Sequence, residues 1–145
     1  YVLNGLQPGT EEACAREGIL PVLNSLEQIE NWAALATRQG KKLPALLQLD
    51  TGMSRLGLDT AEQQTLADDP GLLAATGARL IMSHLACAED EAHPMNRAQL
   101  RTFTAARRQL PPAPASLANS SGIFQCSISQ APICSRVMPS RCCSI

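Results

Sequence analysis

The 145-residue sequence lacks several features that mark whole classes of protein. No apolar run approaches the roughly 20 residues that span a bilayer, and no secretory signal is visible. The formal net charge of −1 leaves no positive excess that would favour nucleic acid or an anionic membrane surface. We therefore expect a cytoplasmic protein that binds neither nucleic acid nor membrane.

The sequence also lacks the cysteine spacing of a disulfide framework or a zinc site. Of its six cysteines, Cys126, Cys134, Cys142 and Cys143 crowd the carboxyl-terminal end. Secreted disulfide domains spread their cysteines along the chain, and structural zinc sites use paired Cys-x-x-Cys spacings. We therefore expect no metal.

Lysine and tyrosine, which often serve as catalytic bases, are scarce. The only tyrosine is Tyr1, and the only lysines are Lys41 and Lys42. The two lysines are adjacent in a Gly-Lys-Lys-Leu-Pro loop that precedes an apolar run, so a solvated pair is their expected role. Because the chain starts at Tyr1, without an initiator methionine and inside an expected strand, we expect its amino end to be cut.

The most informative stretch that is present runs from residue 46 to residue 58. An apolar run to Leu49 is followed by Asp50, Gly52 and Arg55, an order that suits a buried strand opening into a ligand-binding loop. The planar guanidinium of Arg55 could bind a phenolate, carboxylate or phosphate oxygen. A structural salt bridge is the alternative role for this arginine.

Strand and helix patterns alternate along the chain, which predicts repeated βα units with a parallel sheet. Five units are visible, whereas a complete (β/α)8 barrel needs about 250 residues. An open doubly wound domain is the alternative architecture. The expected strands cover residues 1–4, 19–24, 46–49, 78–84 and 115–119. Ser25 is expected to cap the helix after the second strand, with Trp32 as a core residue on its apolar stripe. The helix that follows Arg55 is expected to stop near the Asp-Pro-Gly turn at residues 69–71.

Three segments resemble alanine racemases, the pyridoxal 5'-phosphate (PLP) enzymes that interconvert L- and D-alanine. They are residues 50–57 (Asp-Thr-Gly-Met-Ser-Arg-Leu-Gly), residues 83–90 with His-Pro-Met-Asn at 93–96, and residues 116–123. The resemblance covers about residues 1–124. It implies an α/β fold, a partial (β/α)8 TIM-type barrel of about five consecutive units, with residues 125–145 as a non-homologous tail.

The resemblance also implies a PLP-dependent isomerase that supplies D-alanine for peptidoglycan and works as a homodimer on alanine. Arg55 matches the arginine that binds the PLP phenolic oxygen and lies near the substrate carboxylate. His84 matches the histidine beside the pyridine ring, while Asn119 and Ser120 match the pair at the phosphate. Outside this family context, His84 reads as a satisfied core residue and the Asn-Ser-Ser-Gly run as a turn.

Two catalytic residues of the family have no counterpart here, so we expect the fragment itself to be inactive. They are the Schiff-base lysine and a tyrosine from the partner's second domain. The alternatives are a non-catalytic PLP- or phosphate-binding module, a pseudogene product, or a broader-specificity amino-acid racemase. Gln48 replaces a lysine that many members carry in carbamylated form, and its carbonyl could accept a hydrogen bond from Arg55.

Residues 125–145 show no regular hydrophobic period and resemble no earlier segment. We interpret them as frameshifted or disordered. Codons for residues 139–145 can be chosen, as CCG-TCC-CGG-TGC-TGC-TCT-ATA, so that the frame one base later reads Arg-Pro-Gly-Ala-Ala-Leu-Tyr. That run resembles the Arg-Pro-Gly-x-Ala-Leu-Tyr-Gly segment of the family.

Overall fold

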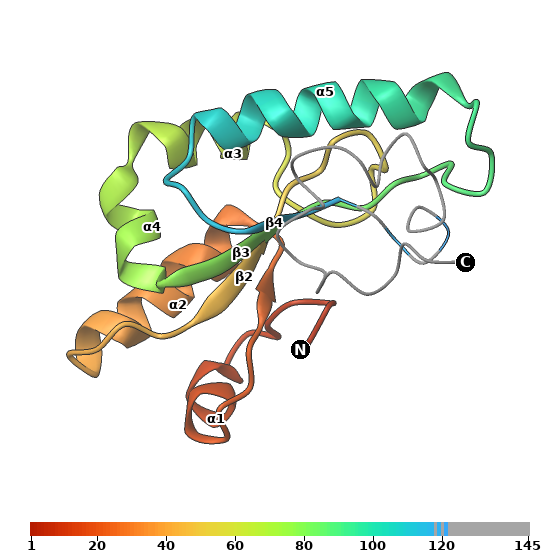
Figure 1. The fold of residues 1–145 in the computed structure, drawn as a ribbon. Coiled ribbons are helices and arrows are strands. Elements are labelled where there is room, and N and C mark those ends of the chain that lie inside the picture. Colours follow the sequence, from red (N-terminus) through yellow and green to blue (C-terminus); the bar gives the residue numbers. More distant parts are fainter. Residues whose placement is uncertain (118, 120, 122–145) are drawn as a thin grey trace, which may run out of the picture.

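The computed structural model describes residues 1–117, 119 and 121. In this part of the chain, four parallel strands pair in chain order, β1-β2-β3-β4 (Figure 1). A doubly wound sheet reverses its strand order, whereas a barrel adds each strand beside the previous one. The predicted partial barrel is therefore confirmed. The strands are β1 (Val22–Leu23), β2 (Ala45–Gln48), β3 (Ala78–Met82) and β4 (Ala115–Ser116).

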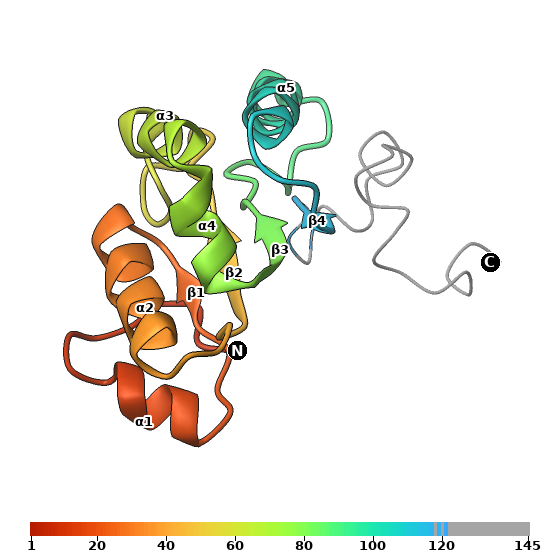
Figure 2. The same cartoon turned by 90° about the vertical axis from the view of Figure 1, so that its left-hand side faces the viewer.

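The helices lie on one side of this sheet and follow its curve from α2 past α3 and α4 to α5 (Figure 2). This arrangement follows from the connections, because two parallel strands need a crossover between them and a helix usually supplies it. The helices are α1 (Glu11–Arg16), α2 (Leu26–Arg38), α3 (Thr60–Asp68), α4 (Pro70–Thr76) and α5 (Pro94–Arg108).

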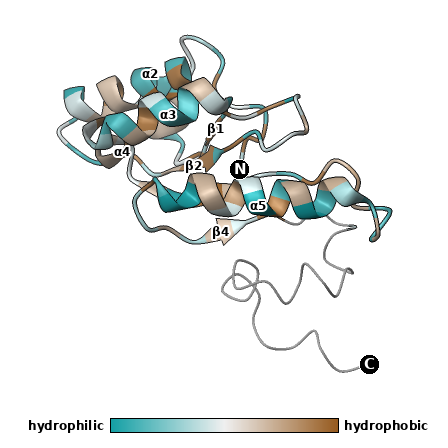
Figure 3. Cartoon of the chain, turned by 90° about the horizontal axis from the view of Figure 1, so that it is seen from above, coloured by the Kyte–Doolittle hydropathy of each residue, from teal (hydrophilic) through white to brown (hydrophobic). Residues whose placement is uncertain are grey.

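The core lies between the sheet and the helices. Hydrophilic and hydrophobic residues alternate around α2 and α5 (Figure 3), as expected for helices with one buried face. Trp32 of α2 is 1% exposed, and its Nε1 donates to the Leu43 carbonyl at 3.2 Å. Phe103 of α5 is fully buried. Trp32 is thus a core residue, as the sequence predicted.

Two polar caps fix where α2 and α3 begin. Asp59 and Glu62 form a reciprocal capping box at the start of α3. The second oxygen of Glu62 accepts from the Leu26 amide at 2.8 Å, which ties α3 to the first turn of α2. Ser25 caps α2 as predicted, but the Gln28 side chain accepts from the Asn24 amide.

The structure differs from the sequence prediction in two elements. The expected strand at residues 1–4 is reduced to one isolated bridge between Val2 and Pro21. An additional helix, α4, begins where a turn was expected, because Pro70 occupies its first position and Asp69 accepts from the Leu72 amide at 3.1 Å. Proline favours a helix start as much as it prevents a helix from continuing.

None of the helices within the described ranges is long and apolar enough to cross a membrane. Ser120 and the tail at 125–145 lie outside the described residues.

Candidate functional site at the strand ends

The side chains singled out by the sequence follow the carboxyl ends of three neighbouring strands. Arg55 belongs to the loop after β2, His84 follows β3, and Asn119 follows β4. Because β2, β3 and β4 are parallel and adjacent, their carboxyl ends meet at one edge of the sheet. Parallel α/β folds place ligand sites at this edge.

The loop after β2 is wound around the carboxylate of Asp50. One oxygen, Oδ1, accepts from the backbone amides of Gly52, Met53 and Ser54 at 2.9, 3.0 and 3.1 Å. Aspartate side chains favour such turns because they satisfy backbone donors locally. Ser54 consequently takes the left-handed conformation, with φ of 55°. The aspartate thereby sets the path of the chain that leads to Arg55.

The base of this loop is closed by backbone hydrogen bonds on both sides. The Asp50 amide donates to the Leu58 carbonyl at 2.8 Å, and the Leu58 amide donates to the Gln48 carbonyl at 2.9 Å. Gly57 has φ of 107°, and a Cβ there would lie 2.8 Å from the Asp50 nitrogen. Only glycine fits this closure, which holds the Arg55 loop as a compact unit.

Arg55 is exposed, and no ion pair holds it within residues 1–117, 119 and 121. The structural salt bridge considered for Arg55 is therefore absent from this part of the chain. Gln48 is 6% exposed and donates through Nε2 to the Leu56 carbonyl at 3.3 Å. Among the described contacts, Gln48 thus supports the backbone next to Arg55 and not its guanidinium. The guanidinium is available for an anionic ligand.

His84 is half-buried at the same edge. Burial lowers the pKa of its imidazole below the ordinary value of 6.5, and the positive charge of Arg55 lowers it further. Both effects disfavour the imidazolium, the first through lost hydration and the second through repulsion. His84 is therefore neutral at pH 7 and close enough to Arg55 to sense its charge.

Asn119 is half-buried, and its Nδ2 donates to the Leu85 carbonyl at 3.1 Å. This bond connects the end of β4 to the residue that follows His84. The structure thus brings Asn119 to the same edge as His84, and Ser120 lies outside the described residues.

A buried set of polar side chains that sequence reasoning missed lies beneath these residues. Thr51 and Ser83 share a hydrogen bond between their hydroxyl oxygens at 2.7 Å, and Ser83 donates to the Leu49 carbonyl at 2.7 Å. Since Ser83 gives its only proton to that carbonyl, Thr51 is the donor to Ser83. Gln99 of α5 donates to the Thr51 oxygen at 3.2 Å. The sequence did contain a signal for this set of side chains, because Gln99 lies four residues before Phe103 and thus on the same buried face of α5.

Neither lysine lies at this edge. Lys41 and Lys42 are exposed and precede β2, at the opposite end of the strand from Asp50. Among the described residues, no group of three histidine, cysteine or carboxylate side chains could hold a metal ion.

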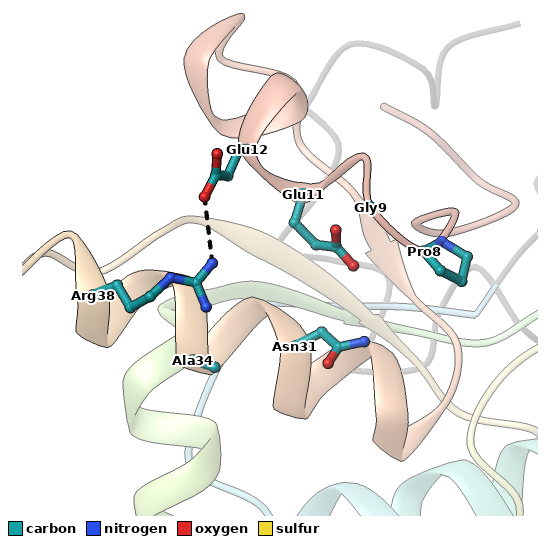
Figure 4. A pocket seen from close by; sticks show the side chains of 7 residues that line it. All are labelled: Pro8, Gly9, Glu11, Glu12, Asn31, Ala34 and Arg38. Atoms are coloured by element: carbon teal, nitrogen blue, oxygen red, sulfur yellow. Dashed lines mark ion pairs between the residues drawn. The ribbon is translucent and has the colours of Figure 1, made fainter.

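A separate hollow with a volume of about 390 Å³ lies between α1 and α2 (Figure 4). Glu12 of α1 and Arg38 of α2 face each other across it at 3.5 Å. Both side chains are well exposed, and exposed ion pairs contribute little to stability. The hollow includes none of the strand-end residues.

Comparison with known proteins assigns the chain to a family. The family model described as "Alanine racemase, N-terminal domain" matches residues 1–137. This chain belongs to that family. Its α/β barrel domain accounts for the parallel sheet and the outer helices described above, and the resemblance seen in the three sequence segments is confirmed.

The relatives are similar over most of this chain. Alanine racemase from Brucella abortus is 62% identical over 124 residues, which are 86% of this chain and 31% of that protein. A catabolic alanine racemase from Mesorhizobium japonicum is 48% identical over 124 residues, 32% of its length. The crystal structure of alanine racemase from Bartonella henselae with covalently bound pyridoxal phosphate superposes with a TM-score of 0.83 and 45% identity. It matches 87% of this chain and 35% of the Bartonella chain. The chain thus spans about a third of these relatives.

Proposed function

We propose that residues 1–124 form part of the PLP pocket of an alanine racemase. The intact protein would interconvert L- and D-alanine in the cytoplasm as a homodimer and supply D-alanine for peptidoglycan. The observation that carries this proposal is the pair at the strand ends formed by Arg55, which has no counter-ion among the described residues, and the half-buried His84. Burial, and then the charge of Arg55, lower the pKa of His84. A histidine whose pKa is shifted by burial and by a nearby charge is typical of functional sites.

The described residues fit PLP on its phenolic and ring sides. When bound, the group supplies an electron sink for a carbanion. The exposed guanidinium of Arg55 would hold the phenolic oxygen and lie near the carboxylate of alanine. The neutral imidazole of His84 can lie beside an aromatic ring without adding a second positive charge. Asn119 and Ser120 would lie at the phosphate.

The 145-residue chain cannot complete the reaction by itself. A racemase needs an amine that bonds the cofactor and proton-transferring groups on both faces of one carbon. Lys41 and Lys42 precede β2 and lie away from the strand-end edge, and Tyr1 is 82% exposed at the first position. We expect no racemisation of alanine by this chain, and measured PLP-dependent racemisation would contradict the assignment.

The missing lysine gives a specific reason to consider a non-catalytic PLP- or phosphate-binding module for this chain taken alone. An absorbance band of bound PLP that disappears after borohydride treatment would indicate a covalent imine and favour an enzyme. Binding of phosphate without such a band would favour the module. A broader-specificity racemase is distinguished by testing amino acids larger than alanine on the intact protein.

We further propose that residues 125–145 are a frameshifted reading of the segment that follows Ser120 in the family. The support is the Arg-Pro-Gly-Ala-Ala-Leu-Tyr run available one base later over residues 139–145. Sequencing the locus tests this proposal. A confirmed reading frame in which no single-base shift recovers that run would contradict it.

A further inference from the structure

We propose that Gln99 is a positioning residue that holds the Arg55 and His84 segments in one fixed arrangement. The proposal rests on the proposed function, because it concerns the site that would bind PLP. Gln99 lies on α5 and is 1% exposed, so it cannot itself reach a ligand in solvent. Its effect would pass through the backbone and side chains it contacts.

The side-chain amide of Gln99 binds the backbone on both sides of Leu85, in the segment that follows β3. Its Nε2 donates to the His84 carbonyl at 2.9 Å, and its Oε1 accepts from the Ala86 amide at 2.8 Å. These two bonds fix the peptide on each side of Leu85. Asn119 binds the Leu85 carbonyl itself, so three consecutive residues are held by side chains from two other elements.

The second Nε2 proton of Gln99 reaches the loop that follows β2 and carries Arg55. It points to the Thr51 hydroxyl oxygen at 3.2 Å, and Thr51 continues to Ser83. Thr51 is adjacent to Asp50, whose carboxylate winds the Arg55 loop. One side chain from an outer helix therefore links the segments that follow the carboxyl ends of β2 and β3.

This link is buried and directional. Donation runs from Gln99 to Thr51, from Thr51 to Ser83, and from Ser83 to the Leu49 carbonyl. Leaving a buried donor without a partner costs more free energy than a formed hydrogen bond contributes. This series of hydrogen bonds therefore resists the loss of any one of its members. Removing the amide breaks the link through α5 and leaves only the direct Thr51–Ser83 bond and the Ser83–Leu49 bond of this set between the two segments.

Gln99→Met tests the proposal, because methionine is similar in length and has no amide. The 145-residue chain contains two histidines, His84 and His93, so imidazole NMR resolves His84 with an internal reference. We expect the pKa of His84 to rise toward 6.5 and the dissociation constant for pyridoxine 5'-phosphate to increase about tenfold. That probe carries the ring and phosphate and needs no lysine. Far-UV circular dichroism should be unchanged.

Gln64→Met is the matched control, because Gln64 is an exposed helical glutamine that contacts Asp68 only among the described residues. It should alter neither readout. A folded Gln99→Met chain that keeps both the His84 pKa and the affinity within about twofold of the original would overturn the proposal.

Thr51→Val decides the case if Gln99→Met does not fold. It removes the bonds of the Thr51 hydroxyl to Gln99 and to Ser83 but keeps the two bonds that Gln99 makes beside Leu85. Both readouts should therefore move in the same direction by a smaller amount, with Thr51→Ser restoring them. A folded Thr51→Val chain identical to the original in both readouts would overturn the proposal. Failure of the original chain to bind pyridoxine 5'-phosphate contradicts the proposed function, and the His84 pKa alone then decides the role of Gln99.

Discussion

Thr51 and Ser83 lie 32 residues apart in sequence and share a buried hydroxyl–hydroxyl hydrogen bond of 2.7 Å. The bond joins the exits of β2 and β3, the strands that lead to Arg55 and His84. It places a buried polar contact between the ends of these strands, and the two hydroxyls also bind the Leu49 carbonyl and the Gln99 amide.

Thr51→Val should lower the free energy of unfolding by about 1–3 kcal/mol, because it leaves one of the two Nε2 protons of Gln99 without a partner in a buried site. Urea unfolding of the 145-residue chain measures the change. Thr65→Val is the matched control, since Thr65 is an exposed helical threonine that bonds only to its own helix among the described residues. The control should stay within about 0.5 kcal/mol. Equal losses in both variants would contradict the prediction.

Arg55→Met should raise the pKa of His84, because it removes the nearby positive charge that disfavours the imidazolium. The shift should be incomplete, since burial, the larger cause, remains. Imidazole NMR measures it, with His93 as internal reference. Arg101→Met, on the exposed face of α5, should leave His84 unchanged. An unmoved His84 in the Arg55 variant would show that the two side chains do not sense each other.

The lowered pKa of His84 also predicts how stability depends on pH. As the pH falls through 6.5, the unfolded chain takes up a proton at His84 before the folded chain does. Protonation of His84 therefore favours unfolding. The contribution of His84 to the free energy of unfolding is present above pH 6.5 and is lost as the pH falls below 6.5 toward the pKa of the folded chain. His84→Gln should remove this part of the pH dependence in urea titrations on either side of pH 6.5. Parallel curves for the two proteins would be the contrary result.

Gly57→Ala should destabilise the chain by about 1–3 kcal/mol, because its backbone is left-handed and a Cβ would press on the Asp50 and Leu49 backbone. Gly40→Ala is the control, because Gly40 is also left-handed but has open space around it. Its cost should be about 1 kcal/mol. Thermal or urea unfolding compares the two, and equal costs would mean that the Gly57 contact is relieved easily.

The sequence predicted that the candidate residues follow strand ends, but it did not predict which side chains support them. One apolar run ends at Leu49 and another ends near His84, so Arg55 and His84 were expected just after strand ends. This was possible because a parallel strand buried on both faces has a nearly continuous apolar sequence. The link through Gln99 was not predictable in the same way. Its partners Thr51 and His84 are distant in sequence, and they meet it only once α5 has packed on the sheet.

Two local errors have physical causes as well. The Asp-Pro-Gly run at 69–71 reads as a stop signal, yet the Asp69 carboxylate and Pro70 start a new helix. The Gln48 carbonyl was a candidate acceptor for Arg55, but the hydrogen bond that the structure gives Gln48 goes from its amide to Leu56. Which end of an amide faces a loop depends on backbone geometry that a motif does not specify.

Titration of the 145-residue chain with pyridoxine 5'-phosphate by isothermal calorimetry is the most direct measurement. It asks whether Arg55 belongs to a pocket for this class of cofactor without requiring a lysine. The account predicts binding that weakens at least about tenfold in Arg55→Met and is unchanged in Arg101→Met. Equal affinity in the original chain and both variants, or no binding at all, would contradict it.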